Sequence, residues 1–256
     1  MKTGEGKFWL FFSLGDFFHL NFSFFLGCHL KFDTFHLPQK YIFLLLILNM
    51  SWFILASFFK LNDSERVSSI EKIMFSLFKA FFFHVLFIAF ILFVIKANTF
   101  SRELLFYSFV ISFFLISSWR LFSNYLIKQY RKTGNNTKNV VIVGSGNRAM
   151  KLHHFFKENA THGYNLLAVI NDRPVKSNFD CAIVELKDLQ EYCLENSVEE
   201  IYYTISSKDD KKTQDLMSFS DNNMIRFRII PDFKSFKSRK ININFYGDIP
   251  IITLRD

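Results

Sequence analysis

The chain has 256 residues, enough for two ordinary domains, and its two halves differ in composition. Of its 36 Phe, 28 lie in residues 1–138, which also carry 15 Lys and Arg against 7 Asp and Glu, whereas residues 139–256 carry 16 of each sign. The net charge of +8 therefore belongs to the apolar half, which excludes the basic surface of a nucleic-acid-binding domain. The three cysteines, Cys28, Cys181 and Cys193, have no ligand-like spacing, which argues against a disulfide framework or a zinc site and favours reduced, buried thiols.

Four apolar windows in the first half are long enough to cross a membrane, since a spanning helix needs about 20 mostly apolar residues. They cover residues 8–30, 41–59, 73–95 and 104–122. A cleavable signal peptide fits the first window poorly, because the window is too long, contains Asp16 and precedes three further spans. We therefore predict a four-helix transmembrane region over residues 1–127.

A basic run follows the fourth window and predicts the orientation of the bundle. Lys128, Arg131, Lys132 and Lys138 have no acid among them, and positive residues favour the cytoplasmic side. We therefore predict a basic cytoplasmic linker over residues 128–138. With four spans, both termini are expected on the cytoplasmic side of the membrane.

Asp16 is an ionisable residue inside the first window, where a charge is costly unless it faces protein or water. We expect it to lie near the interface or to pair with Lys79 or His84. A structural pairing is favoured over a transport role, because the spans show no inverted repeat.

From residue 139 short apolar runs alternate with amphipathic stretches, which predicts an α/β domain with a mainly parallel sheet. Strands are expected at 140–143, 166–170, 181–184, 200–205 and 224–230, with Pro174 and Pro231 ending two of these segments. Helices are expected from the end of the first strand to about 158, at 186–196 and at 208–223, and one extended piece within 241–254. Residues 139–256 are thus predicted to form a Rossmann-like, nucleotide-binding-type domain.

The candidate binding residues of this domain follow its first strand directly. They are Gly144, Ser145, Gly146, Asn147 and Ala149, with Asp172 at the end of the second strand. In a dinucleotide-binding loop the first glycine allows a tight turn, the second lets backbone N–H groups approach a pyrophosphate, and a small third residue lets the helix pack closely. A carboxylate such as Asp172 would bind ribose hydroxyls.

The loop therefore predicts a nucleotide ligand, UDP-sugar or NAD. The alternative is that its glycines serve only the turn and helix packing, and the sequence offers no evident partner for hydride transfer.

Other polar clusters favour structural interpretations. The acid pairs at 199–200 and 209–210 could in principle hold Mg²⁺, but a strand edge and a helix start carry such pairs routinely. The histidine pair at 153–154 has no third ligand in reach. We therefore predict no metal site and no catalytic residue in this chain.

Taken in order, these features resemble the N-terminal region of the polyprenyl-phosphate glycosylphosphotransferases, bacterial enzymes that begin exopolysaccharide and capsule synthesis. The likeness covers nearly the whole chain, with four spans and then a Rossmann-like, CoA-binding-like part. It comprises the basic linker, the strand and glycine loop at 139–146, the strand end at 170–172, the strand entry at 198–201, residues 230–232 and the closing stretch 245–255.

The resemblance implies transfer of sugar-1-phosphate from a UDP-sugar to undecaprenyl phosphate, by a following catalytic domain that uses Mg²⁺ and an Asp–Glu pair. None of that domain is among these 256 residues, so the chain is expected to be inactive alone. It would be a truncated gene product, a shortened fragment or a freestanding accessory piece. Expected partners are the lipid bilayer, undecaprenyl phosphate, polysaccharide-assembly proteins and a second copy of the chain.

Two alternatives remain at this point. A membrane-bound nucleotide-sugar dehydratase or epimerase shares four spans and a similar glycine loop, but should continue into a longer NAD-binding domain. A non-enzymatic membrane scaffold or nucleotide sensor is the other. The closing stretch at 247–255 favours the glycosylphosphotransferase resemblance over the dehydratase.

Overall fold

A computed structural model gives the architecture of the chain and describes residues 5–62, 66–67, 69–96, 100–172, 179–204, 210–230, 243–246 and 249–253. The chain divides into two compact units, Met1–Ile127 and Lys128–Asp256. Some residues that the sequence-based predictions used lie outside the described residues. They are Pro174, Asp209, Pro231 and parts of the closing stretch.

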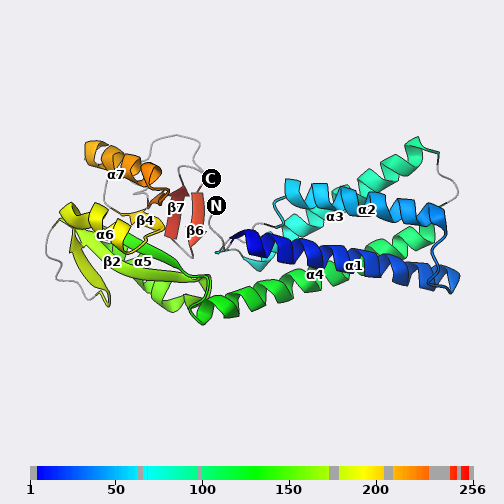
Figure 1. The fold of residues 1–256 in the computed structure, drawn as a ribbon, viewed down its shortest axis with the longest axis horizontal. Helices are drawn as coiled ribbons and strands as arrows, with labels where there is room; N and C mark the ends of the chain where they lie inside the picture. The colour runs from blue at the N-terminus through cyan, green and yellow to red at the C-terminus, as the bar shows by residue number, and fades with distance from the viewer. Residues whose placement is uncertain are drawn as a thin grey trace. The chain divides into compact units, whose positions relative to one another are not determined.

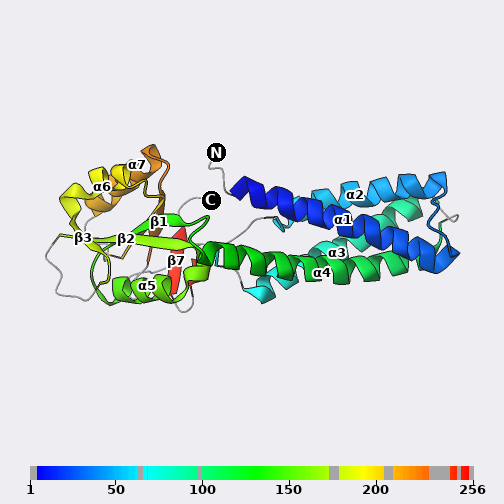
Figure 2. The ribbon, with the colours of Figure 1, turned by 60° about the horizontal axis from the view of Figure 1, so that its bottom comes forward.

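The first unit is a bundle of four long helices that lie side by side (Figures 1 and 2). They are α1 (Glu5–Phe32), α2 (Gln39–Phe58), α3 (Ile70–Val94) and α4 (Arg102–Lys132). Within the described residues, these four helices are long and apolar enough to cross a membrane. The many exposed Phe and Leu side chains on their outer faces would be unfavourable in water and are suited to lipid. The predicted four-span region is confirmed.

Close approach of α1 and α4 depends on two glycines of α1. A Cβ on Gly15 would lie 2.0 Å from the Trp119 indole nitrogen, and one on Gly27 would lie 2.6 Å from the Ser108 hydroxyl. Helices in a membrane gain little from the hydrophobic effect and associate through van der Waals packing at small residues. The glycines therefore set how closely α4 packs against α1.

The second unit is a seven-stranded sheet with helices on both faces. Its strands are β1 (Lys138–Val143), β2 (Tyr164–Asn171), β3 (Ala182–Glu185), β4 (Glu200–Tyr203), β5 (Arg226–Ile229), β6 (Ile243–Tyr246) and β7 (Ile249–Thr253). The order is β3-β2-β1-β4-β5-β7-β6, and the first five strands are parallel. Strands β7 and β6 add an antiparallel edge. The predicted mainly parallel α/β domain is confirmed, although its tail forms two strands rather than one extended piece.

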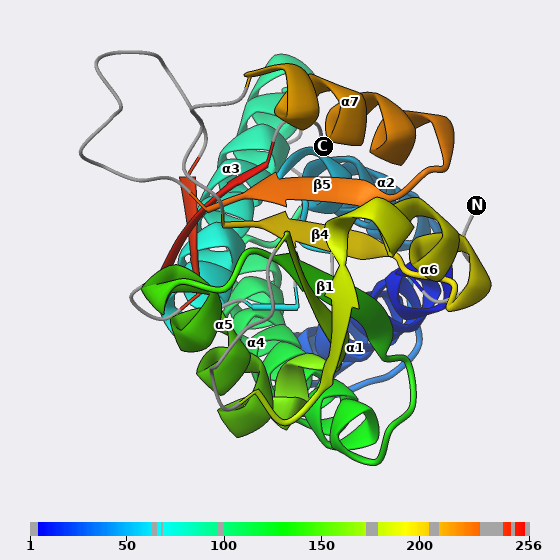
Figure 3. The same ribbon diagram turned by 90° about the vertical axis from the view of Figure 1, so that its left-hand side faces the viewer.

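Helices cover the sheet unequally. Figure 3 shows α6 (Leu189–Glu195) and α7 (Asp210–Asn222) on one face and α5 (Asn147–Glu158) on the other. Short 3₁₀ turns, Ala160–His162 and Leu186–Asp188, precede β2 and α6. Beneath α6 and α7 lies a core of alternate strand residues, including Val141, Ile170 and Ile201. Cys193 joins this core as a free thiol, and burial raises its pKa to about 12.

The predicted basic linker, 128–138, takes a more ordered form than a loop between two domains. Helix α4 continues through Lys132, and Lys138 is already the first residue of β1. Only the short turn between them departs from regular structure, so the basic run begins as the last turn of a helix.

Candidate nucleotide site at the glycine loop

The glycine loop lies at the point where the strand order of the sheet reverses. Strand β1 pairs with β2 on one side and with β4 on the other, and the chain leaves β1 at Val143 toward α5. In open α/β sheets, ligands bind at this position because the loops diverge there and leave a crevice. The topology therefore puts Gly144, Ser145 and Gly146 where a ligand site is expected.

The backbone conformation at position 144 requires a glycine. Its φ is 113°, in the left-handed region that side chains rarely adopt, and its N–H donates to the Ile170 carbonyl at 2.7 Å. Thr204 directly follows β4, the strand that pairs with β1. Its N–H and its hydroxyl both donate to the Val143 carbonyl, at 2.8 and 2.9 Å, and so hold the residue that precedes Gly144. Thr204 belongs to no motif, so the sequence carries no signal for this role.

Gly146 differs from Gly144 in having an ordinary extended backbone, with φ −78° and ψ −174°. A Cβ built on it would meet nothing within 4 Å, so the space beside it is open. Gly146 is also the N-cap of α5 and has no side chain to accept the first N–H groups of that helix. The loop thus presents open space next to uncapped backbone donors, the arrangement that suits an anion.

The next residues complete the loop. Asn147 begins α5 and is exposed, while Ala149 is fully buried, as the predicted close packing of helix on strand requires. Arg148 donates to the Ile230 carbonyl at 3.3 Å, so it links the start of α5 to the segment after β5. This contact joins residues 82 positions apart, and no local sequence pattern predicts it.

Asp172 follows β2 at the same carboxyl edge of the sheet, as predicted. Its carboxylate lies 3.6 Å from the Lys212 ammonium of α7, and both side chains are more than half exposed. A carboxylate in a solvated pair keeps acceptor capacity for hydroxyl groups, because such pairs are weak. Its role toward a ribose, like the ligand contacts of the loop, stays a prediction.

Glu200 has a structural role, in line with the favoured interpretation of the acid pair 199–200. It is fully buried, accepts from Lys138 at 3.1 Å, Arg228 at 2.8 Å and the Tyr202 hydroxyl at 2.9 Å, and so ties β1, β4 and β5 together. Burial alone would raise the pKa of Glu200, but the charges of Arg228 and Lys138 outweigh burial and hold the pKa below its ordinary value. A carboxylate surrounded by cations is a poor metal ligand.

His153 is similarly structural. Its Nε2 accepts from the Asp180 backbone N–H at 3.3 Å, and burial lowers its pKa. Among the described residues no group of three or more His, Cys, Asp or Glu is placed to hold a metal ion.

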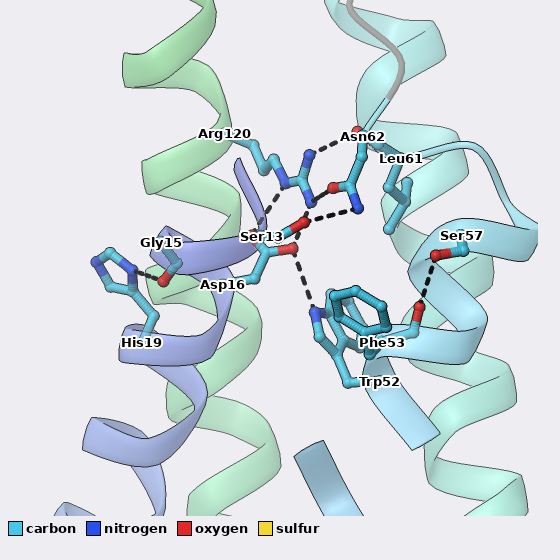
Figure 4. Close-up of polar contacts among 10 residues, drawn as sticks. All are labelled: Ser13, Gly15, Asp16, His19, Trp52, Phe53, Ser57, Leu61, Asn62 and Arg120. Carbon is cyan, nitrogen blue, oxygen red and sulfur yellow. Dashed lines mark hydrogen bonds and ion pairs between the residues drawn. The ribbon is translucent and has the colours of Figure 1, made fainter. Parts of the chain in front are cut away.

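Asp16 lies inside the helix bundle and forms an ion pair, but the predicted partners were wrong. Its carboxylate accepts from the Arg120 guanidinium, at 3.1 Å from Nε, and from the Trp52 indole N–H at 3.2 Å (Figure 4). Lys79 instead lies over the Phe75 ring, and His84 contacts Ser51 and the Leu48 carbonyl. Helix packing brings α4, rather than α3, against this part of α1.

The guanidinium of Arg120 makes two further hydrogen bonds. They reach the Leu61 carbonyl at 2.5 Å and the Asn62 amide oxygen at 2.8 Å, and Asn62 in turn donates to Ser13 at 3.1 Å. Figure 4 shows Asp16, the Leu61 carbonyl and Asn62 grouped around the Arg120 guanidinium. The buried charges of Asp16 and Arg120 thus compensate each other, which indicates a structural connection rather than a transport path.

Fold and site together define a membrane protein that carries a Rossmann-like domain with a glycine loop. Residues 58–231 match the family described as "CoA-binding domain", and the chain belongs to this family. It is also 23% identical over 139 residues to the UDP-glucose:undecaprenyl-phosphate glucose-1-phosphate transferase of Xanthomonas campestris pv. campestris. That match covers 50% of this chain and 28% of the transferase.

These matches confirm the predicted resemblance to the N-terminal region of the polyprenyl-phosphate glycosylphosphotransferases. They do not favour the dehydratase or epimerase alternative. Two solved structures are similar to part of the chain. UDP-D-quinovosamine 4-dehydrogenase from Vibrio fischeri is 15% identical with a TM-score of 0.33, over 38% of this chain and 81% of that one. The Rex-family repressor RSP in complex with β-NADH is 13% identical with a TM-score of 0.36, and the match covers 49% of this chain and 58% of that one.

Proposed function

We propose that this chain is the membrane and regulatory portion of a sugar transferase that starts exopolysaccharide or capsule synthesis. In such an enzyme, sugar-1-phosphate passes from a UDP-sugar to undecaprenyl phosphate, and a module other than these 256 residues carries out the transfer. The similarity to the Xanthomonas transferase supports the reaction class. Because the chain spans about a quarter of that relative, the activity of the whole enzyme belongs to the proposal.

The observation that carries the regulatory role is the open, uncapped glycine loop at the switch point of the sheet. Gly146 leaves space beside the first turn of α5, and Asp172 stands at the end of the neighbouring strand. A pyrophosphate at the loop and a ribose at Asp172 would match the way dinucleotide-binding folds hold their ligands. The proposed ligand is a nucleoside diphosphate compound, either a UDP-sugar or NAD.

The family description adds coenzyme A, which also contains a nucleoside pyrophosphate, to the compounds worth testing. The shared chemistry is the pyrophosphate, and the comparison among the three compounds identifies which nucleotide the domain recognises.

Hydrogen exchange on the intact chain in lipid nanodiscs tests this proposal. Amides at 143–150 should exchange more slowly with millimolar UDP-glucose, NAD or coenzyme A, because a bound anion accepts from the N–H groups of the first turn. Gly146→Val should keep the exchange pattern of the ligand-free protein, since its backbone is extended and the space is open, yet lose the added protection. Asn165→Val, on an exposed residue of β2, is the control and should retain it. Unchanged exchange with all three compounds would show that the glycines serve only the turn.

Location and assembly complete the proposal. The basic residues at the end of α4 support an orientation with both termini in the cytoplasm of a bacterial inner membrane. The glycine-loop domain would then face the cytoplasmic pool of nucleotide sugars. Undecaprenyl phosphate, polysaccharide-assembly proteins and a second copy of the chain are its proposed partners.

A further inference from the structure

Helices α3 and α4 line an open groove on the bundle. Its volume is about 940 Å³, which is in the range of small-molecule sites. The walls are nearly all apolar: Phe81 and Ile88 are buried in it, whereas Phe82 and Phe106 are exposed along it. An apolar groove of this kind on a membrane-spanning bundle suits a hydrocarbon chain.

Two cations line the same groove. Lys96 follows the end of α3 and Arg102 begins α4, so both lie at the end of the groove where α3 ends and α4 begins. Both side chains are exposed. The neighbouring acid, Glu103, is bonded to Lys31 of α1. The N-terminus of α4 adds its own positive potential at this end.

We propose that this groove binds a phospholipid with an anionic head group, whose acyl chain lies between α3 and α4 and whose phosphate lies against Lys96 and Arg102. Charge complementarity supports this occupant, because the long stems of both residues can follow apolar surface while their charged ends reach the head-group level. The inference rests on the membrane assignment of the bundle and is independent of the glycine loop.

A second copy of the chain suits the groove less well. In a two-fold dimer through this face, Lys96 and Arg102 of both copies would stand at the same depth in the membrane. Four cations would then meet with no described acid lining the groove to offset them. An anionic lipid removes this repulsion and fills the apolar part.

Native mass spectrometry of the intact chain tests the proposal after reconstitution with equal amounts of phosphatidylglycerol and phosphatidylcholine that have identical acyl chains. The wild-type chain should retain mainly phosphatidylglycerol. Lys96→Gln and Arg102→Gln should each lower the retained ratio of anionic to zwitterionic lipid by about fivefold, the factor to which about 1 kcal/mol per cation corresponds. Lys40→Gln, at the start of α2 and outside the groove, removes one charge at the same end of the bundle and should leave the ratio unchanged.

A second variant separates the head-group contact from occupancy of the groove. Ala89 lines the groove and is exposed, so Ala89→Phe should fill it and reduce retention of both lipids. Ile54→Phe, on an exposed position of α2, is the matched control. The proposal is overturned if both lipids are retained equally, if Lys40→Gln lowers the ratio as much as Arg102→Gln, or if the groove variants change only the proportion of dimer.

Discussion

Asp16 and Arg120, 104 residues apart, form a buried ion pair that joins the first helix of the bundle to the fourth. Each side chain is 3% exposed, and the further groups that bond to the pair, Trp52 and Asn62, come from other segments of the bundle. A charge in this position is stable only while its partner is present.

Removing one member of the pair should therefore destabilise the bundle more than removing both. Arg120→Met or Asp16→Leu alone should cost about 3–5 kcal/mol, because each leaves a buried charge without its partner. The double variant should recover most of that loss. Equilibrium unfolding in mixed micelles of increasing SDS measures the difference. Lys79→Met, at a residue whose ammonium lies over the Phe75 ring, is the control; additive losses in the double variant would contradict the ion-pair account.

Glu200 should make the α/β domain sensitive to acid. The pKa of Glu200 is depressed below its ordinary 4.5 in the folded state, so its ionised form stabilises the fold above that pH. This stabilisation is lost as pH falls below about 4.5 and through the folded-state pKa. In Glu200→Gln that part of the pH dependence should be absent. Hydrogen exchange of the β4 amides across this pH range, corrected for intrinsic rates, checks it; equal slopes in both proteins would disprove it.

Gly144 should tolerate a side chain much less well than Gly146. Gly144→Ala places a Cβ at a φ of 113°, which should cost about 1–3 kcal/mol and loosen the β1–α5 turn. Gly146→Ala has ordinary backbone angles and open space, and should leave the stability unchanged. Exchange rates of the β1 amides, measured side by side in the two variants, report the difference. Equal protection would mean that the turn relaxes without cost.

Membrane orientation can be read from cysteine labelling in a background without the three native cysteines. Thr34→Cys, between α1 and α2, should react with an impermeant reagent from outside the cell. Lys60→Cys, after α2, and Asn135→Cys, after α4, should react only once the membrane is permeabilised. Labelling of Asn135→Cys in intact cells would reverse the proposed orientation.

Residues 1–256 should release no UMP from UDP-glucose when supplied with Mg²⁺ and undecaprenyl phosphate. This expectation follows from the proposal that a module other than these residues carries out the transfer, and from the cations that occupy Glu200, the buried acid of the α/β domain. Membranes with the Xanthomonas transferase provide the positive control. UMP release that disappears when an acid of the α/β domain is replaced would reveal a catalytic site in this chain.

Hydropathy and periodicity along the chain determine most of the architecture. The four spans, the strand and loop around Gly144, and the parallel sheet follow from patterns that are local in sequence, and the observed element ends differ from the predicted ones mostly by a few residues. Ala149 was likewise predictable, because helix packing on the first strand demands a small residue.

The pairing of charges was decided by tertiary structure alone. Sequence offered Lys79 and His84 as partners for Asp16, and only the packing of α4 against α1 selects Arg120. Glu200 is bound by cations from two neighbouring strands, and the strand order that places them there is non-local. Such contacts join residues far apart in the chain, and a one-dimensional pattern carries no information about which distant segments meet.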